Sequence, residues 1–191
     1  MAVIELSNEE VMKCRRFALD VVDTNIEKYR QRNQFNKKKI IKDIYVGKKG
    51  EIAAWKYLNN IGVDEGTYTS GIFTNKPDFE IYGARRKSFD ADLFDETSKE
   101  SFHVKTMTHE SAERWGLSWS FQIEDPLVSR PEQKDHIVLC EVLDKFNVDV
   151  KFVMDALMAQ NLYGVPRLYK LRRIKKVLYW KDIAEELNLD K

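Results

Sequence analysis

FDADLFDETSKESFHVKT, the sequence of residues 89–106, contains two short stretches in which apolar and polar residues alternate. The apolar positions recur every second residue on both sides of the polar run 95–100, and this is the period of a strand with one buried face. The polar run suits the tight connection of a β-hairpin. We therefore predict two adjacent strands in which Asp92 lies beside Lys105, on the face opposite the apolar side chains.

Two long helices are predicted before this hairpin. Ser7 followed by Glu10 is a capping box, and apolar residues then recur at helical spacing over residues 7–32. A second helical pattern covers about 39–60 and is followed by Gly62, a residue type common at helix ends. Each helix is expected to present an apolar stripe to the core.

The chain around and after the hairpin is expected to complete a sheet. HIVLCEV at 136–142 is almost continuously apolar, which predicts a central strand covered on both faces. A shorter strand is predicted around residues 79–81, and a helix at about 155–162. The basic extension 163–191 is expected to lead through residues 176–180 into a short final helix that begins near residue 182.

Composition excludes several classes of protein. Hydrophobic residues make up 43% and charged residues 33% of the chain, and no apolar run approaches the roughly 20 residues of a membrane helix. Glu5, Glu9 and Glu10 stand where a secretory signal would be basic and then apolar, so we expect a cytoplasmic protein that does not bind membranes. Cys14 and Cys140 have no partner at metal-ligand spacing and are predicted to be reduced core thiols.

Motifs of several enzyme families are missing. The chain has no Gly-rich phosphate loop, no Gly-x-Ser-x-Gly turn, no cysteine set for structural zinc and no His-x-x-x-His pair. The net charge is only +1, so affinity for nucleic acid would have to come from local clusters of charge. Two basic clusters are present, at 37–49 and at 167–176.

Four short motifs follow one another along the chain: GKKGEIAA at 47–54, then Pro77-Asp78, Asp92 and Val104-Lys105-Thr106. Over roughly residues 40–142 their order resembles that of the PD-(D/E)xK nucleases, a superfamily with a restriction-endonuclease-like fold. In that family a helix glutamate, a strand aspartate and an (Asp/Glu)-x-Lys strand surround one or two divalent ions.

The resemblance implies a role for each matching residue. Glu51 would be the helix acid, Asp92 the principal metal ligand and Val104 the donor of a backbone carbonyl. Lys105 would orient the attacking water or stabilise charge. A metal ion that neutralises phosphate and acidifies water, with a cation beside it, is what phosphodiester hydrolysis needs. The implied cofactor is Mg²⁺, with Mn²⁺ as the alternative.

His103 departs from the family pattern, because it stands where a second acidic residue is usual. Imidazole suits manganese and softer ions, so His103 would shift the metal preference, act through a water or bond to the substrate; otherwise it is an ordinary sheet-face histidine. Asp78 precedes His103 by 25 residues, against 11 for Asp92, and the shorter interval fits one hairpin. Asp78 is therefore a secondary candidate for a metal ligand, with a turn after Pro77 as its alternative role.

Both central predictions have a plain structural alternative. Glu51 lies on the apolar stripe of its helix, where an uncompensated carboxylate is unstable. A slightly rotated helix would instead place it at a boundary, paired with Lys48 or Lys49. Without a metal, Asp92 and Lys105 would form an ordinary cross-strand ion pair.

Polar and basic residues outside this set are candidates for DNA contact. In the stretch 115–122 the aromatic residues are expected in the core, so the polar ones are the better candidates. The late basic stretch alternates cations with apolar residues, so its exposed side would either grip phosphates or be merely solvated. The predicted DNA-binding residues are Lys48, Lys49, Ser118, Gln122, Arg167, Lys170, Arg172 and Arg173.

The predicted fold class is α/β, in a single domain over residues 1–191. It would have a restriction-endonuclease-like core, a central mixed sheet of four to five strands flanked by helices, an N-terminal helix and a basic C-terminal segment. The predicted function is a divalent-metal-dependent endonuclease that hydrolyses phosphodiester bonds in DNA, as a homodimer if both strands are cut. The alternative is a nuclease fold that has lost catalysis and serves as a nucleic-acid-binding or protein-interaction module.

Overall fold

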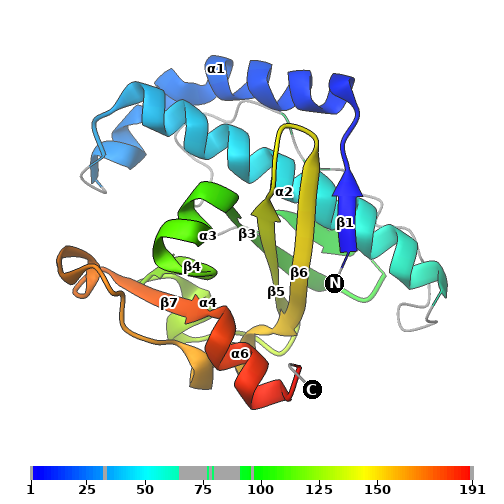
Figure 1. The fold of residues 1–191 in the computed structure, drawn as a ribbon, viewed down its shortest axis with the longest axis vertical. Helices are drawn as coiled ribbons and strands as arrows, with labels where there is room; N and C mark the ends of the chain where they lie inside the picture. Colours follow the sequence, from blue (N-terminus) through cyan, green and yellow to red (C-terminus); the bar gives the residue numbers. More distant parts are fainter. Residues whose placement is uncertain are drawn as a thin grey trace.

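Helices and strands are mixed along the chain, and the structure, a computed structural model, describes residues 2–31, 34–64, 77, 79, 91–95 and 97–189. The strands are β1 (Ala2–Glu5), β2 (Leu93–Asp95), β3 (Glu100–Thr108), β4 (Ser118–Gln122), β5 (Asp135–Val142), β6 (Asn147–Asp155) and β7 (Lys175–Tyr179). The α-helices are α1 (Asn8–Gln31), α2 (Lys37–Asp64), α3 (His109–Trp115), α4 (Pro126–Ser129), α5 (Ala156–Ala159) and α6 (Trp180–Leu187). The short 3₁₀ helices are η1 (Gln160–Leu162) and η2 (Tyr169–Leu171). Figure 1 shows their arrangement.

The two predicted long helices are confirmed. The capping box forms at the start of α1, where the Glu10 backbone N–H donates to Ser7 Oγ (3.2 Å) and the Ser7 N–H donates to the Glu10 carboxylate (2.7 Å). Helix α2 extends past the predicted end to Asp64. The Asn59 side chain, which favours helix ends in the sequence, donates instead to the Trp55 carbonyl one turn back (2.8 Å).

The main sheet has five strands in the order β1-β6-β5-β3-β2 and is mixed, as predicted. β3 and β5 run parallel, whereas the other neighbouring pairs are antiparallel. β5 is the central strand, in agreement with its continuous apolar run. The hairpin of β2 and β3 forms with Leu93 opposite Phe102, but β2 is short, Asp92 lies just before it, and the expected pairing of Asp92 with Lys105 is not made. Its turn is held by Asp95 Oδ1, which accepts from the Thr97 N–H at 2.8 Å.

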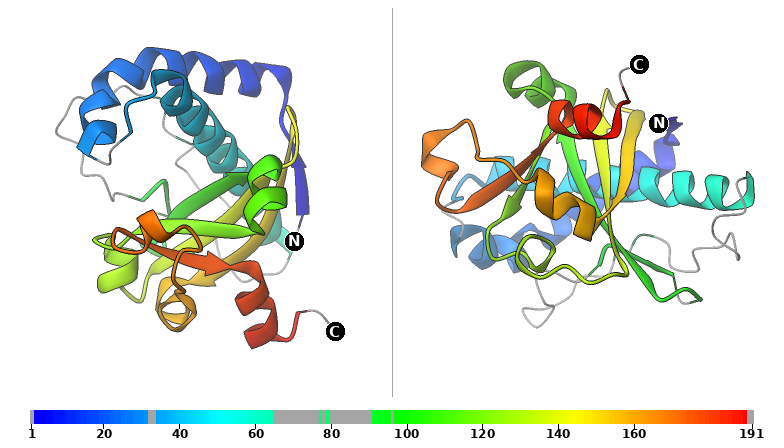
Figure 2. Two further views of the ribbon diagram at one scale, coloured as in Figure 1. Left: turned by 60° about the vertical axis from the view of Figure 1, so that its left-hand side comes forward. Right: turned by 90° about the horizontal axis from the view of Figure 1, so that it is seen from below.

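Each face of this sheet has its own core. In β5, Val138 and Cys140 point to the face covered by α1 and α2, while Ile137 and Leu139 point to the opposite face. That opposite face is covered by β4, β7 and the helices α4 to α6. Figures 1 and 2 show α1 and α2 on one side of the sheet and β7 with α6 on the other. The sheet therefore lies between a helical layer and a mixed layer.

Helix α2 crosses β3 at very close range. A Cβ atom added to Gly50 would lie 1.9 Å from Thr106 Oγ1, far inside ordinary contact distance. A glycine at this position is thus what allows the helix backbone to rest on the strand. The close crossing fixes the position of α2 relative to β3.

A second sheet, of β4 and β7, forms from two segments far apart in sequence. Trp119 and Phe121 of β4 are buried, which confirms the core prediction for these two aromatic residues of 115–122, whereas Trp115 is partly exposed and lines a pocket. Trp119 Nε1 donates to the Cys140 carbonyl (2.9 Å), so β4 is attached to the central strand. Residues 175–179, for which no element was predicted, form β7, and the predicted short final helix is α6.

Other expectations have mixed outcomes. The helix expected at 155–162 is α5 followed by η1, and the strands β1, β4, β6 and β7 were not predicted. Both cysteines are free and buried, as expected, and burial raises the pKa of Cys14 to about 12. No helix among the described residues is long and apolar enough to cross a membrane. Ile81, Asp78 and Asp90 lie outside the described residues.

Candidate functional site

The Asp92 carboxylate lies beside β3, just before the first residue of β2. Asp92 Oδ2 accepts from the Val104 backbone N–H at 2.8 Å, and the Asp92 N–H donates to the Phe102 carbonyl at 3.0 Å. In a strand, the N–H and C=O of one residue point to the same neighbouring side. The Val104 carbonyl therefore points to the same edge as the Asp92 carboxylate, as the predicted ligand pair requires.

His103 is buried among acidic side chains on the face of β3 opposite α2. Its Nε2 lies 3.6 Å from Asp135 Oδ1 at the start of β5. Burial lowers the pKa of His103 below its ordinary value, although the nearby Asp92 and Asp135 oppose that shift. The imidazole is therefore neutral at pH 7 and can either accept or donate a hydrogen bond.

Lys105 points to the same face and meets a buried acid that sequence analysis did not single out. Its Nζ lies 3.3 Å from Asp125 Oδ2 and 5.0 Å from the centre of the Phe121 ring. Asp125 Oδ1 also accepts from the Leu127 N–H at 3.2 Å, as the N-cap of α4. An aspartate directly before Pro126 is a sequence signal for a helix start, but nothing in it points to a lysine 20 residues earlier.

Glu51 lies in the helical layer rather than beside Lys105. It points to the interior, as predicted, and forms an ion pair with Lys48 at 2.5 Å, in which both side chains are nearly buried. Lys48 also contacts the rings of Phe17 and Phe79. Among the described residues no hydrogen bond or ion pair joins Glu51 to Asp92 or Lys105.

The acidic side chains do not form a complete metal-binding group by themselves. In the described ranges, no three histidine, cysteine, aspartate or glutamate side chains are grouped so that they could hold a metal ion. Asp78, the secondary candidate ligand, lies outside the described residues. Of the predicted ligand residues, the described residues bring Asp92 and Val104 into contact, through the Val104 N–H and the Asp92 carboxylate.

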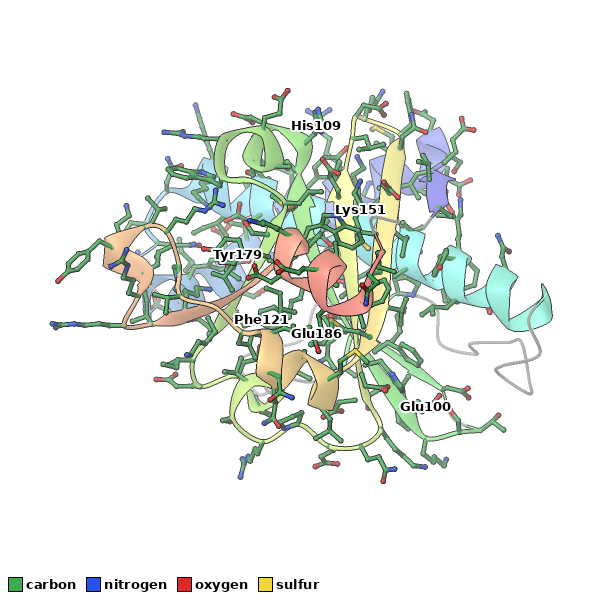
Figure 3. The ribbon with its side chains drawn as sticks, turned by 60° about the horizontal axis from the view of Figure 1, so that its bottom comes forward. Glu100, His109, Phe121, Lys151, Tyr179 and Glu186 are labelled. Atoms are coloured by element: carbon green, nitrogen blue, oxygen red, sulfur yellow. The ribbon has the colours of Figure 1, made fainter. Side chains whose placement is uncertain are left out.

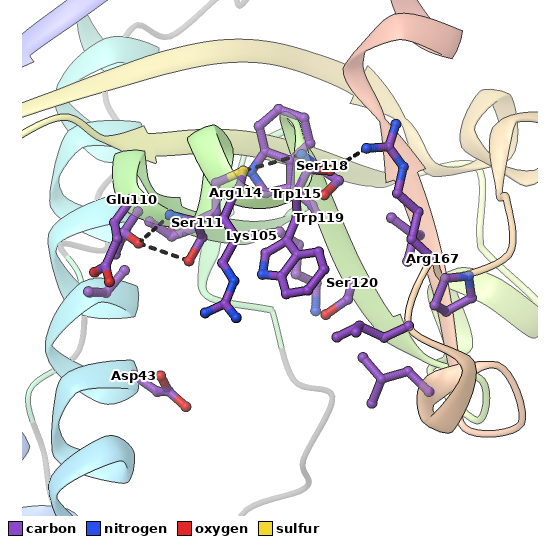
Figure 4. A pocket seen from close by; sticks show the side chains of 18 of the residues that line it. Asp43, Lys105, Glu110, Ser111, Arg114, Trp115, Ser118, Trp119, Ser120 and Arg167 are labelled. Carbon is purple, nitrogen blue, oxygen red and sulfur yellow. Dashed lines mark hydrogen bonds between the residues drawn. The ribbon is translucent and has the colours of Figure 1, made fainter.

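A groove of about 540 Å³ runs beside β3, between α2 on one side and β4, β7 and the segment 166–171 on the other (Figure 4). Its basic residues are Lys39, Lys42, Lys105, Arg114 and Arg167, and its acidic residues are Asp43 and Glu110. The two acids are paired with the two α2 lysines, at 2.5 and 3.0 Å. The lining therefore carries an excess of positive charge.

No family model, curated protein or solved structure matched this chain.

The predicted DNA-binding residues divide into three groups. Lys48 and Lys49 are buried instead of exposed, and Lys49 Nζ donates to the Asp144 carbonyl (2.6 Å), so both ammonium groups are used internally. Ser118 lines the groove, whereas Gln122 lies at the other end of β4, opposite Lys175. The exposed residues on and beside the groove are Arg167, Lys170, Arg172 and Arg173.

An ion network around the buried Glu141 carboxylate fixes α3, one wall of the groove, to the sheet. Glu141 of β5 accepts from Lys151 (2.9 Å) and contacts His109 Nδ1 (2.8 Å) at the start of α3, in the region where His109 and Lys151 are labelled in Figure 3. Burial alone would raise the pKa of Glu141, but the bonds from His109 and Lys151 lower it. The same bond raises the pKa of His109. No local sequence pattern indicates this network, because its members lie on three separate elements.

Proposed function

We propose that this chain is a divalent-metal-dependent nuclease that hydrolyses phosphodiester bonds in DNA beside β3. The observation that carries the proposal is the contact between Asp92 Oδ2 and the Val104 N–H, with Lys105 as the next residue along the strand. It brings a carboxylate to a backbone segment whose next residue carries an ammonium group, which is held by Asp125 rather than by Asp92. These are the groups that the resemblance to PD-(D/E)xK nucleases implies.

The donor set fits a hard divalent ion. Asp92 uses one carboxylate oxygen for the Val104 N–H, and its second oxygen and the Val104 carbonyl would be the ligands. Mg²⁺ prefers oxygen donors and is commonly held by one or two carboxylates together with waters, so a small protein donor set suffices. Such an ion, when bound, would neutralise the phosphate and acidify a water. Mn²⁺ is the alternative, because the neutral imidazole of His103 lies beside Asp92.

Lys105 would act as the positioned cation of the site. Its ammonium group is held by Asp125, which is itself fixed as the cap of α4. A positioned charge stabilises developing negative charge better than a mobile one, because it needs no reorganisation during the reaction. Lys105 also lines the groove, so a phosphate bound there would be within its reach.

The basic groove would hold the DNA backbone. Arg114 and Arg167 each lie against an aromatic ring, those of Trp115 and Tyr179, at 4.9 and 5.3 Å. These contacts restrain the guanidinium groups and so reduce the entropy lost when they bind phosphate. Phosphate contacts of this kind give affinity without sequence choice. If both strands are cut in one event, a homodimer would place one such groove on each strand.

The direct test is plasmid nicking by the purified protein with Mg²⁺ or Mn²⁺. We expect the wild-type chain to nick, Lys105→Ala to lose nicking with an unchanged circular dichroism spectrum, and Lys145→Ala to nick normally. Lys145 is a suitable matched control because it is a lysine on the β5–β6 turn, against the Phe146 ring and outside the groove lining. Equal nicking by Lys105→Ala and wild type would contradict the proposal.

A second candidate function is nucleic-acid binding without cleavage. It is favoured by two observations: His103 stands where the resemblance expects an acid, and the described residues contain no group of three metal-binding side chains. Salt-dependent DNA binding with no nicking under Mg²⁺ or Mn²⁺ would support this candidate over the nuclease. A protein-interaction module would neither bind nor nick DNA.

A further inference from the structure

Tyr169, at the start of η2, is the most exposed of the large apolar side chains in the part of the chain that the structure describes, with 77% of its surface accessible. It stands between Leu168 and Leu171, which line the groove, and is itself directed to solvent on the rim. Leaving a tyrosine ring in water forgoes the burial energy that an aromatic side chain normally contributes. Its position beside a basic groove makes the ring available to contact a ligand bound in that groove.

The Tyr169 ring is held in place from one side. The Arg172 guanidinium lies over the ring, 5.5 Å from its centre, and Arg172 Nε is anchored by the Pro166 carbonyl at 3.2 Å. The Leu168 carbonyl accepts from the Leu171 N–H, and the Tyr169 carbonyl accepts from the Arg172 N–H, so the turn itself is closed. One ring face is therefore covered by a fixed cation, and the exposed fraction leaves the other face accessible.

The segment that carries Tyr169 is also attached firmly to the body. The Tyr179 hydroxyl donates to the Val165 carbonyl (3.1 Å) and accepts from the Arg167 N–H (3.1 Å). Arg167 Nη1 donates to the Trp115 carbonyl (2.9 Å). A binding residue on a segment held in this way loses little entropy when a ligand arrives.

We infer that Tyr169 is a stacking platform for an unpaired nucleotide base, and that the groove takes nucleic acid with a single-stranded or frayed segment. An aromatic ring surrounded by cations is the arrangement that binds single strands, because every free base offers a π face and the cations follow the phosphates. The neighbouring cations are Arg167, Lys170, Arg172 and Arg173. In an intact duplex the base faces are already stacked on each other, so the ring would have nothing to hold. This inference rests on the proposed function and specifies its substrate class.

Three variants separate stacking from other roles of the side chain. Tyr169→Phe keeps the ring, whereas Tyr169→Leu keeps an apolar side chain without a π face. Leu157→Ala, on α5, is the control for an exposed apolar residue elsewhere, since Leu157 is 45% exposed and outside the groove lining. Because Tyr169 is so exposed, none of its substitutions is expected to disturb folding.

The test is fluorescence anisotropy in EDTA, which prevents cleavage, with labelled oligothymidylate and oligouridylate of about 16 nucleotides and a blunt DNA duplex. Stacking involves the base and not the sugar, so the substitution is expected to affect the DNA and the RNA single strand alike. Tyr169→Leu should weaken binding of each single strand about tenfold, and binding of the duplex less than about twofold. Tyr169→Phe and Leu157→Ala should bind like the wild type.

The inference is overturned if Tyr169→Leu binds the single strands as tightly as the wild type. It is also overturned if Tyr169→Leu loses as much affinity for the duplex as for the single strands, or if Tyr169→Phe loses as much single-strand affinity as Tyr169→Leu. Plasmid nicking with Mg²⁺ or Mn²⁺ is measured in parallel. Nicking by the wild type with no selective loss in Tyr169→Leu would refute the stacking role alone. A selective loss without any nicking would keep the stacking role and refute the nuclease. A wild type that neither binds nor nicks would refute both.

Discussion

The close crossing of α2 and β3 predicts opposite effects for the same substitution at two glycines of one helix. A Cβ at Gly50 would lie 1.9 Å from Thr106 Oγ1 and 3.0 Å from both its Cβ and Cγ2. A Cβ at Gly47, one turn earlier, would meet nothing within 4 Å. Gly50→Ala should therefore destabilise the protein, whereas Gly47→Ala should stabilise it.

The magnitudes follow from two terms. Replacing glycine by alanine inside a helix stabilises by about 1 kcal/mol, and this term applies to both positions. At Gly50 the overlap adds an overpacking cost of about 1–3 kcal/mol, because Thr106 is β-branched and turning it would bring Cγ2 towards the same space. The propensity terms cancel in the difference between the two variants, so that difference, about 1–3 kcal/mol, measures the overlap alone.

The assay is thermal and urea unfolding of the two single variants. For a domain of this size each kcal/mol corresponds to about 2–4 °C in Tm, so Gly47→Ala should melt a few degrees above the wild type and Gly50→Ala below Gly47→Ala by roughly 2–12 °C. A Thr106→Ala background should reduce the penalty of Gly50→Ala, with a coupling of about 1 kcal/mol or more. Equal stabilities of Gly47→Ala and Gly50→Ala, without coupling to Thr106, would refute the close crossing.

Three further predictions concern the site and its walls. Asp125→Asn keeps a cap for α4 but removes the counter-charge of Lys105, so nicking should fall about tenfold to a hundredfold with little change in Tm. Asp125→Ala should in addition lose about 1 kcal/mol of stability, because it removes the cap. Equal nicking by Asp125→Asn and wild type would contradict the role of Asp125. Because the bond to Glu141 raises the pKa of His109, its contribution to the stability of the folded protein is fully present below the unfolded-state pKa and is lost as the pH rises through the folded-state pKa. In Glu141→Gln the pKa of His109, followed by NMR, should fall towards its ordinary value. An unchanged pKa would rule out the bond. Arg114→Gln should make the dependence of log DNA affinity on log salt concentration less steep by about 0.9, as expected for one lost phosphate contact. An unchanged slope would exclude Arg114 from the interface.

The local patterns predicted the elements that depend on neighbouring residues. Period-two alternation in 89–106 predicted the β2–β3 hairpin, and the continuous apolar run of 136–142 predicted the central strand. The capping box at Ser7 and Glu10 predicted the start of α1. In each case one short segment contains the physical cause, since side-chain burial on one face or a cap within one turn is enough.

The contacts of the site depend on packing between distant segments. Alternation in SWSFQ at 118–122 is compatible with a strand, but its partner β7 lies more than 50 residues later. Asp125 reaches Lys105 only because α4 begins on the face to which β3 directs its odd-numbered side chains. For Glu51 the sequence left Lys48 as one of two partners, and only the rotation of α2 against α1 and β3 decides between them.

The most direct measurement of the central claim is the anomalous scattering of manganese in crystals of the wild-type protein and of Asp92→Asn soaked in Mn²⁺. We expect one ion in the wild type, bound to the Asp92 carboxylate and the Val104 carbonyl, and loss of that ion in Asp92→Asn. A wild-type crystal without manganese at this edge, or with the ion retained in Asp92→Asn, would contradict the assignment of the β3 edge as a metal-dependent nuclease site.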